Sequence, residues 1–172
     1  MIVILSHISS MFSPSSHWVI EEALDRDVAA IAEIHGESFV RPWSDGDFEK
    51  MLADPIYDCL VARQHGRADL PAAGFVMFRV AADEAEIISI ATEQTNRKKG
   101  AGRALMEGAI RQLEADRIPI LFLEVDENNL AAISLYNSLH FKKIGERKGY
   151  YTGDEGKQES HSTALVMQRE LG

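Results

Sequence analysis

The chain has 172 residues, of which 45% are hydrophobic, and this is enough for one domain with a full-sized core. Its formal net charge of −9 argues against a nucleic acid as the main partner, since nucleic acids bind to basic faces. The single cysteine, Cys59, excludes an internal disulfide and a cysteine-rich metal site, and its apolar surroundings favour a buried thiol over a nucleophile.

Residues 1–17 predict an irregular N-terminal arm. The apolar run at residues 2–5 is too short to span a membrane, and it lacks the basic leader and small-residue cleavage site of a signal peptide. The segment "SSMFSPSSH" that follows is rich in serine and contains a proline, which is typical of irregular chain. We therefore expect a cytoplasmic protein with no membrane partner, in which residues 18–172 form a single domain.

The first half of the chain predicts one strand, two helices and three further strands. The strand covers 17–24 and the helices cover 25–39 and 42–54. Ser44 is expected to cap the second helix, with Asp47 three residues on completing a capping box. The strands are expected at 58–63, 72–80 and 85–92, the first two separated by a loop that contains "HGRADLP".

The second half predicts two helices between strands. An apolar stripe identifies the first helix and consists of Leu105, Met106, Ala109, Ile110 and Leu113. The strand at 118–126 is almost continuously apolar, so we expect both of its faces to be covered. A helix at 128–140 and strands at 141–151 and 162–171, around a polar loop, complete the chain. This order implies a mixed sheet with helices on both faces.

The stretch "RKKGAG" at residues 97–102 predicts an anion-binding loop at the start of a helix. Its glycines allow close approach of the backbone, and free N–H groups at the helix N-terminus point toward the ligand. A phosphate or pyrophosphate would suit such a loop, although neither common phosphate-loop pattern is present. The alternative is a glycine turn with solvated bases. Bases are unfavourable at a helix N-terminus, which favours the functional interpretation.

The pattern R-x-x-G-x-G, with "ISIAT" before it and "LEVDENNLAAISLYNSLHF" after it, resembles the GNAT (Gcn5-related N-acetyltransferase) superfamily. The resemblance covers residues 18–170 and is most specific over 88–151. Within the superfamily the chain is most similar to the RimI-type ribosomal-protein-alanine N-acetyltransferases. The motifs that carry this similarity are "RPWS" at 41–44, "LEV" at 123–125, "NNLAAISLY" at 128–136 and "GYY" at 149–151.

The resemblance implies an α+β fold with a mixed, mostly antiparallel central sheet and helices on both faces. Its two central parallel strands splay apart to admit acetyl-CoA, which is the expected cosubstrate. The residues implied in holding acetyl-CoA lie on the strand, the loop and the later helix, and they are Ile90, Ala91, Arg97, Lys98, Lys99, Gly100, Ala101, Gly102, Arg103, Asn129 and Tyr136. The strand would pair with the pantetheine arm as an added strand does.

Two of these residues have structural alternatives. Asn129 would hold the pantetheine, but an asparagine at this position can equally be a simple helix N-cap. The resemblance makes Tyr136 the general acid toward the leaving thiolate, whereas its position on an apolar helix face is also that of a core residue.

Glu124 is the candidate general base. It lies inside "ILFLEVD", where a carboxylate in a covered strand is costly without a purpose or a partner. Burial penalises the charged form of a carboxyl group, which is one way to obtain a general base near neutral pH. The matching glutamate is the proposed base in the RimI type. The alternative is a strand-end carboxylate that faces water.

The expected acceptor is the N-terminal alanine α-amine of a ribosomal protein. Residues at positions that border the acceptor groove in the RimI type are Trp43, Tyr150 and Tyr151, and Asp126 adds a carboxylate beside the proposed base. The acidic balance suits a basic partner, although acidity also serves solubility alone, and Trp43 could instead be a packing anchor. The alternatives are a GNAT enzyme for a small amine or a lysine, and a CoA-binding interaction module without activity. No metal is expected.

Three departures from the family pattern bear on these expectations. His140 stands where a glycine usually closes the helix, so either a left-handed histidine or an altered helix end is expected. Asp126 stands where an arginine is common after "LEV". The polar loop at 152–162 is longer than usual. These departures concern the acceptor more than the reaction.

Overall fold

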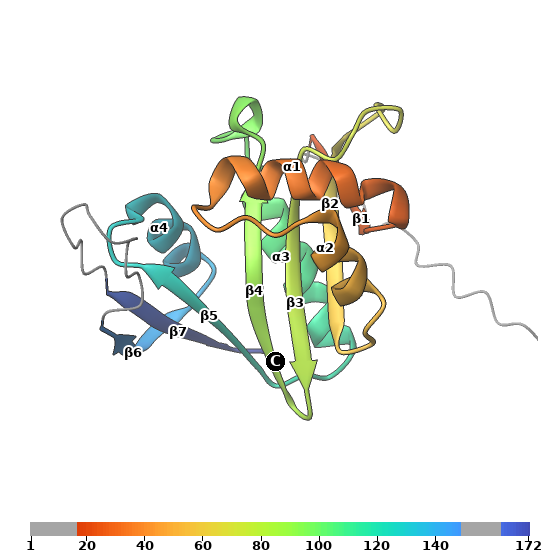
Figure 1. Ribbon diagram of the computed structural model, residues 1–172. Coiled ribbons are helices and arrows are strands. Elements are labelled where there is room, and N and C mark those ends of the chain that lie inside the picture. Colours follow the sequence, from red (N-terminus) through yellow and green to blue (C-terminus); the bar gives the residue numbers. More distant parts are fainter. Residues whose placement is uncertain (1–16, 149–162) are drawn as a thin grey trace, which may run out of the picture.

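A computed structural model describes residues 17–148 and 163–172 of the chain (Figure 1). The strands of its sheet are β1 (Trp18–Glu22), β2 (Tyr57–Gln64), β3 (Gly74–Ala81), β4 (Glu84–Thr92), β5 (Ile120–Asp126), β6 (Lys142–Arg147) and β7 (Ala164–Glu170). The helices are α1 (Val28–Ser38), α2 (Asp45–Leu52), α3 (Ala101–Ala115) and α4 (Leu130–Ser138), with short 3₁₀ turns at Asp25–Asp27 and Gln94–Asn96. Residues 1–16 of the predicted arm, which was expected at residues 1–17, lie outside the described residues.

All the described strands form one sheet in the order β1-β2-β3-β4-β5-β7-β6. Neighbouring strands are antiparallel with one exception, the parallel pair β4 and β5 at the centre. The mixed, mostly antiparallel sheet predicted above is therefore confirmed.

Helices cover both faces of the sheet, as predicted. Figure 1 shows α1 and α2 in front of the strands and α3 behind them. Each face has its own core because alternate residues of a strand point to opposite sides. On β2, Leu60 and Ala62 pack into the core beneath α3 and α4, whereas Cys59 and Val61 pack into the core beneath α1 and α2. We call these the α3 core and the α1 core.

The parallel pair is short, and the two strands then part. Glu84–Ile87 of β4 pair with Ile120–Leu123 of β5, and no pair joins the remaining described residues of these two strands. Figure 1 shows β5 leaning away from β4 from this shared end. The predicted splay is thus present, and we call it the fork.

A β-bulge marks the start of the fork on β4. Met77 pairs with Ser89 and Phe78 pairs with Ile87, so Ile88 has no partner on β3. The extra residue reverses the alternation along the strand. Ile87 therefore belongs to the α3 core, whereas Ala91, four residues later, belongs to the α1 core.

The helix signals were accurate, and one strand expectation was wrong. Ser44 caps α2: its hydroxyl accepts from the Asp47 N–H at 3.3 Å, and the Asp47 carboxylate accepts from the Ser44 N–H at 2.9 Å. Strand β5 was expected to be covered on both faces. Instead its residues alternate between buried and half-buried, because α1 and α2 cover the strands on the other side of the fork.

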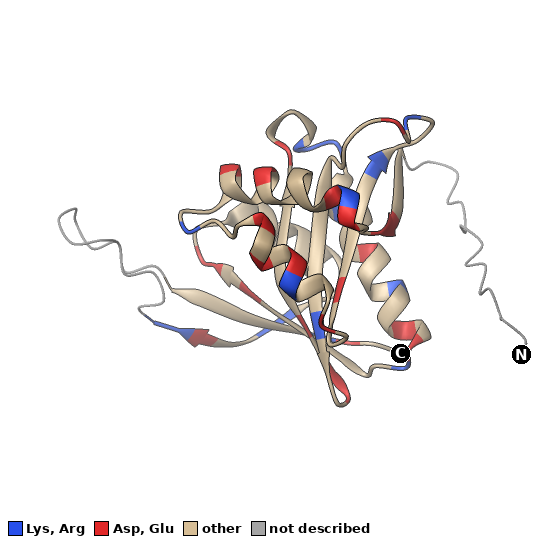
Figure 2. Cartoon of the chain, turned by 45° about the vertical axis from the view of Figure 1, so that its right-hand side comes forward, with Lys and Arg blue, Asp and Glu red and all other residues tan. Residues whose placement is uncertain are grey.

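Acidic side chains dominate the surface of the two front helices. Figure 2 shows acidic residues in red along α1 and α2, and the exposed ones are Glu33, Glu37, Asp45, Asp47 and Glu49. None of the helices in the described chain has the length and apolar character needed to cross a membrane.

Candidate active site

The loop before α3 has the backbone geometry of an anion cradle. Gly100 is the residue before the helix and has φ +87°, and Lys98 is also left-handed with φ +60°. The first N–H groups of a helix have no partner within it. None of the hydrogen bonds found among the described residues uses the N–H groups of residues 98–103. These donors are therefore available to a ligand, and they lie where the helix dipole favours negative charge.

A tryptophan from the edge of the sheet holds this loop in place. The indole N–H of Trp18 donates to the carbonyl oxygen of Lys99 at 2.8 Å, and Trp18 itself is buried in the α3 core. Arg97 and Arg103 are exposed and reach outward: Arg97 contacts the Ser38 hydroxyl at 3.3 Å, and Arg103 contacts the Ser138 hydroxyl at 2.6 Å. The loop is thus tied to β1, α1 and α4.

The fork lies beside this loop, at the end of β4. Ile90 and Ala91 are on the part of β4 that no longer pairs with β5, so the backbone groups on that edge have no strand partner. Ile90 packs toward the α3 core and Ala91 lies in the α1 core. An extended chain with amide groups would fit this edge in the way an added strand does.

Glu124 lies on the other arm of the fork and is less buried than expected. Its side chain is 22% exposed, and its carboxylate is 3.0 Å from the guanidinium of Arg147 on β6. Its neighbours Leu123 and Val125 belong to the α3 core, so Glu124 points to the opposite face of β5. The carboxylate therefore has both a charged partner and access to water, instead of a dry strand interior.

Tyr136 points from α4 into the α3 core, on the other side of β5 from Glu124. It is 6% exposed and its ring centroid is 5.9 Å from that of Phe141. Burial raises the pKa of its phenol to about 12. The hydroxyl is therefore protonated throughout the physiological range and able to donate.

The end of α4 explains the unusual His140. This residue has φ +65°, so it takes the left-handed conformation that a glycine usually supplies. The His140 N–H donates to the Asn137 carbonyl and the Phe141 N–H donates to the Tyr136 carbonyl, both at 3.0 Å. These two bonds form a Schellman motif, and the Phe141–Tyr136 contact is its hydrophobic component.

Asn129 occupies the N-cap of α4, so the alternative interpretation of this residue as a helix cap is correct. Its side-chain oxygen accepts from the Ala132 N–H at 3.1 Å, which leaves the amide NH₂ as a possible donor to a ligand. Capping does not exclude a role in cofactor binding, which stays a prediction.

The predicted acceptor residues that are described already have structural partners. Trp43 stacks on His35 with centroids 4.6 Å apart, and its backbone N–H donates to His35 Nδ1 at 3.1 Å. It is half-buried and packs against the α1 core, as a packing anchor would. Asp126 accepts from the Asn128 N–H at 2.8 Å and so shapes the turn before α4. Tyr150, Tyr151 and the loop at 152–162 lie outside the described residues.

Sequence reasoning missed two residues that organise the site. Arg147 pairs with Glu124 although 22 residues separate them, because β7 lies between β5 and β6 and brings their ends level. Trp18 anchors a loop about 80 residues away. Neither contact has a local signal, although a tryptophan at the start of an edge strand could have prompted a search for its indole acceptor.

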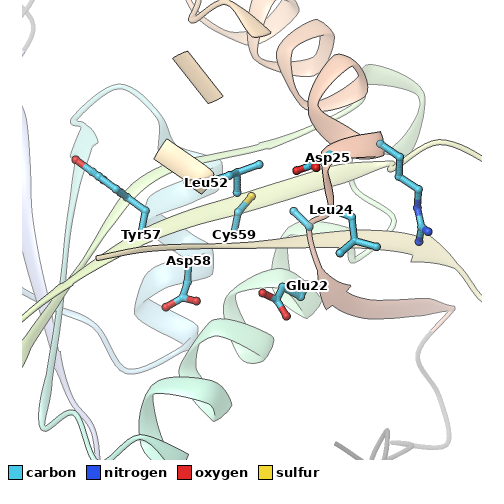
Figure 3. Close-up of a pocket in the computed structure, with 9 residues that line it drawn as sticks. Glu22, Leu24, Asp25, Leu52, Tyr57, Asp58 and Cys59 are labelled. Carbon is cyan, nitrogen blue, oxygen red and sulfur yellow. The ribbon is translucent and has the colours of Figure 1, made fainter. Parts of the chain in front are cut away.

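A cavity of about 330 Å³ lies away from all these residues. It is formed between the end of β1, the start of β2 and the end of α2, and Glu22, Asp25, Tyr57 and Cys59 are among its lining residues (Figure 3). Cys59 is a buried free cysteine in the α1 core, which confirms the expectation of a buried thiol, and this burial raises its pKa to about 12. None of the predicted site residues lines this cavity.

Comparison with known proteins agrees with the fold and the motifs. The model of the acetyltransferase (GNAT) family matches residues 28–141. The chain is 32% identical over 141 residues to [ribosomal protein bS18]-alanine N-acetyltransferase of Escherichia coli, covering 82% of this chain and 92% of that protein. It is 30% identical over 148 residues to N-alpha-acetyltransferase RimI of Mycobacterium tuberculosis, covering 85% and 88%.

Solved structures show the same architecture. The crystal structure of the ribosomal-protein-S18-alanine N-acetyltransferase from Escherichia coli superposes with a TM-score of 0.77 at 30% identity, covering 90% of this chain and 94% of that one. The crystal structure of Arabidopsis thaliana NAA60 with acetyl-CoA has a TM-score of 0.74 at 17% identity, covering 90% and 98%, and supports the fold alone. The expected enzyme class, an N-acetyltransferase, is confirmed, and the chain belongs to the acetyltransferase (GNAT) family.

Proposed function

We propose that the protein transfers the acetyl group of acetyl-CoA to a protein N-terminal α-amine, with the N-terminal alanine of a ribosomal protein as its acceptor. The observation that carries this proposal is the fork, which places a carboxylate on one face of β5 and a protonated phenol on the other. The relatives whose names specify ribosomal-protein alanine support the choice of acceptor.

The residues around the loop fit the donor substrate. Free N–H groups at residues 98–103 and the cationic side chains of Arg97, Lys98 and Lys99 would hold the pyrophosphate of acetyl-CoA. The unpaired edge of β4 at Ile90 and Ala91 would hold the amide-containing arm, with the Asn129 amide as a further donor. Left-handed Gly100 keeps a side chain out of the approach to this backbone.

The two faces of β5 would separate the two proton transfers. Bound acetyl-CoA supplies an acetyl group activated as a thioester. Glu124 takes a proton from the amine as its nitrogen forms the new bond to the acetyl carbon, and Tyr136 gives its proton to the sulfur as the carbon–sulfur bond breaks. An N-terminal amine has a pKa of roughly 7.7–8.0, so a carboxylate needs to give only modest help.

Charge supports a basic protein acceptor. The exposed carboxylates of α1 and α2 lie on the face toward which Glu124 points, and Trp43 is half-buried on the same side. A chain end followed by lysines or arginines would meet opposite charge there. A ribosomal acceptor also suits the expected cytoplasmic location. That no nucleic acid, membrane or metal takes part stays a prediction.

Acetylation of a peptide panel tests this proposal. We expect a peptide with N-terminal alanine followed by basic residues to be preferred over free lysine and over polyamines. Its binding should weaken with added salt, because exposed charges are screened over about 10 Å at 0.1 M. Truncation of Trp43 should raise the peptide KM more than the acetyl-CoA KM.

The outcomes separate the alternatives. If spermidine or an aminoglycoside outcompetes every peptide, the protein acceptor is wrong and the acetyltransferase assignment stands. If acetyl-CoA binds and no amine is acetylated, the chain is a CoA-binding interaction module.

A further inference from the structure

Ser89 is a buried polar residue that the fold does not explain. It lies on β4 directly after the bulged Ile88, and only 7% of its surface is exposed. Its Oγ is the one buried side-chain oxygen or nitrogen without a hydrogen-bond partner in the described part of the chain. A buried hydroxyl without a partner costs stability, so such a group in a native protein calls for an explanation.

Packing alone would favour an alanine at this position. Ser89 pairs with Met77 on β3, and Met77 and Ala91 both lie in the α1 core on the same face of the sheet. Ala91, two residues further along the strand, shows that a small apolar side chain suits this face. The hydroxyl therefore adds a polar atom to this face without making a hydrogen bond within the described chain.

The register of the fork places Glu124 opposite this serine, on the other arm. The last parallel pair joins Ile87 to Leu123, so the next positions, Ser89 beyond the bulge and Glu124, lie at about the same level on the two arms. Both side chains point to the face that carries α1 and α2, away from the α3 core. Ser89 and Glu124 therefore lie on the two arms of the fork and on the same side of the sheet.

We propose that Ser89 positions the acceptor: its Oγ accepts a hydrogen bond from one N–H of the attacking amine while Glu124 takes a proton from the same nitrogen. This inference rests on the proposed acetyl transfer. Two acceptors on the same side of an amine hold its lone pair toward the acetyl carbon between the arms. Ser89 Oγ, which has no hydrogen-bond partner among the described residues of the free protein, thus receives one from the bound substrate.

Steady-state kinetics of Ser89→Ala test the proposal, with an alanine peptide and a small amine as acceptors. Loss of one neutral hydrogen bond predicts a fall in kcat/KM of about 3–10-fold for every amine used. Affinity for acetyl-CoA, measured by calorimetry, should stay within about 2-fold. The melting temperature should not fall and should rise by about 2–4 °C, because an unsatisfied group has been removed.

Two further variants distinguish hydrogen bonding from packing. Ser89→Cys keeps the shape of the side chain but replaces the oxygen by a larger atom that is a weaker acceptor, so its kcat/KM should be intermediate. Met77→Leu alters packing beside Ser89, keeps the hydroxyl, and should retain activity. The pH dependence of kcat/KM should be unchanged in Ser89→Ala, because the base remains.

Each result has one meaning. Wild-type kcat/KM in Ser89→Ala, with every acceptor, overturns the role of Ser89 and leaves the acetyl transfer intact. A defect equal to that of Ser89→Ala in Met77→Leu assigns the effect to packing and also overturns it. If the wild type prefers the small amine, the proposed acceptor fails, while impaired Ser89→Ala still supports the positioning role. If the wild type acetylates no amine, both proposals fail.

Discussion

The two sides of the candidate site differ in the groups that face the ligand: backbone N–H groups on one side and side chains on the other. On the donor side, the loop at residues 97–103 presents backbone N–H groups in a conformation set by left-handed Gly100 and by the bond from Trp18. On the acceptor side, Trp43, Glu124 and Asp126 are side chains that each already have a structural contact. Backbone recognition depends on glycines and is insensitive to most other changes. Side-chain recognition can be altered one residue at a time.

The largest effect is expected on the acceptor side. Glu124→Gln removes the proposed base and keeps the shape, so turnover should fall by roughly 10²–10⁴-fold while acetyl-CoA affinity is nearly unchanged. Assays of acetyl transfer measure the turnover, and calorimetry with acetyl-CoA measures the affinity. Glu170→Gln makes the same change of charge at the far end of the sheet and serves as the control. Full activity of Glu124→Gln across pH 6–9 would mean that positioning alone carries catalysis.

On the donor side, acetyl-CoA binding should be lost when the backbone conformation of the loop is changed. At Gly100, φ is +87°, a conformation that a β-branched residue rarely adopts, so Gly100→Val should distort the loop and weaken acetyl-CoA binding by about 10²-fold or more. Calorimetry measures the affinity and circular dichroism shows that the fold survives.

A second left-handed glycine provides a matched control for this variant. Gly66, in the loop between β2 and β3, has φ +74° and open space around it. Gly66→Val should therefore cost similar strain without changing the affinity. Unchanged acetyl-CoA binding by a folded Gly100→Val would remove the loop from the site.

The same contrast explains which features could be predicted from sequence. Local patterns carried the capping box of Ser44 and Asp47, the helix stripe from Leu105 to Leu113, and the glycine loop, because each depends on neighbours a few residues away. The half-open face of β5 depends on where β4 and β5 part, and the ion pair of Glu124 depends on a strand two places along the sheet. Such features are set by the order of the strands in the sheet, so they cannot be predicted from the apolar residues of β5 itself.

Alkaline pH should destabilise both cores. Burial raises the pKa of Cys59, in the α1 core, and that of Tyr136, in the α3 core, each to about 12. The unfolded chain then loses these protons first, from about pH 9 for the thiol and pH 10 for the phenol. The contribution is fully present below these values and is lost as the pH rises toward 12. The expected slope is up to about 1.4 kcal/mol per pH unit for each group.

Denaturant titrations between pH 8 and 11 measure this loss. Cys59→Ala should reduce the slope from pH 9 upward, and Tyr136→Phe should reduce it only from pH 10. A free energy of unfolding that is constant from pH 9 to 11 in the wild type contradicts the burial of both groups. Tyr136→Phe also removes the proposed acid, so its turnover should fall near neutral pH, where its stability should equal that of the wild type.

The smallest effect should come from the left-handed end of α4, which sets the backbone that carries Tyr136. His140 holds φ +65° there, and a glycine adopts this conformation without the steric cost of a Cβ. His140→Gly should therefore stabilise the protein by about 1 kcal/mol, which is roughly 2–4 °C in melting temperature for a chain of this size. Both bonds of the Schellman motif use backbone atoms, so Tyr136 should keep its place and turnover should be unchanged. Arg117, with φ +60° at the end of α3, is the matched position, and Arg117→Gly should bring a similar gain far from the reacting groups. A drop in turnover in His140→Gly alone would show that the histidine side chain takes part in the site, and the donor side would then depend on side chains as the acceptor side does.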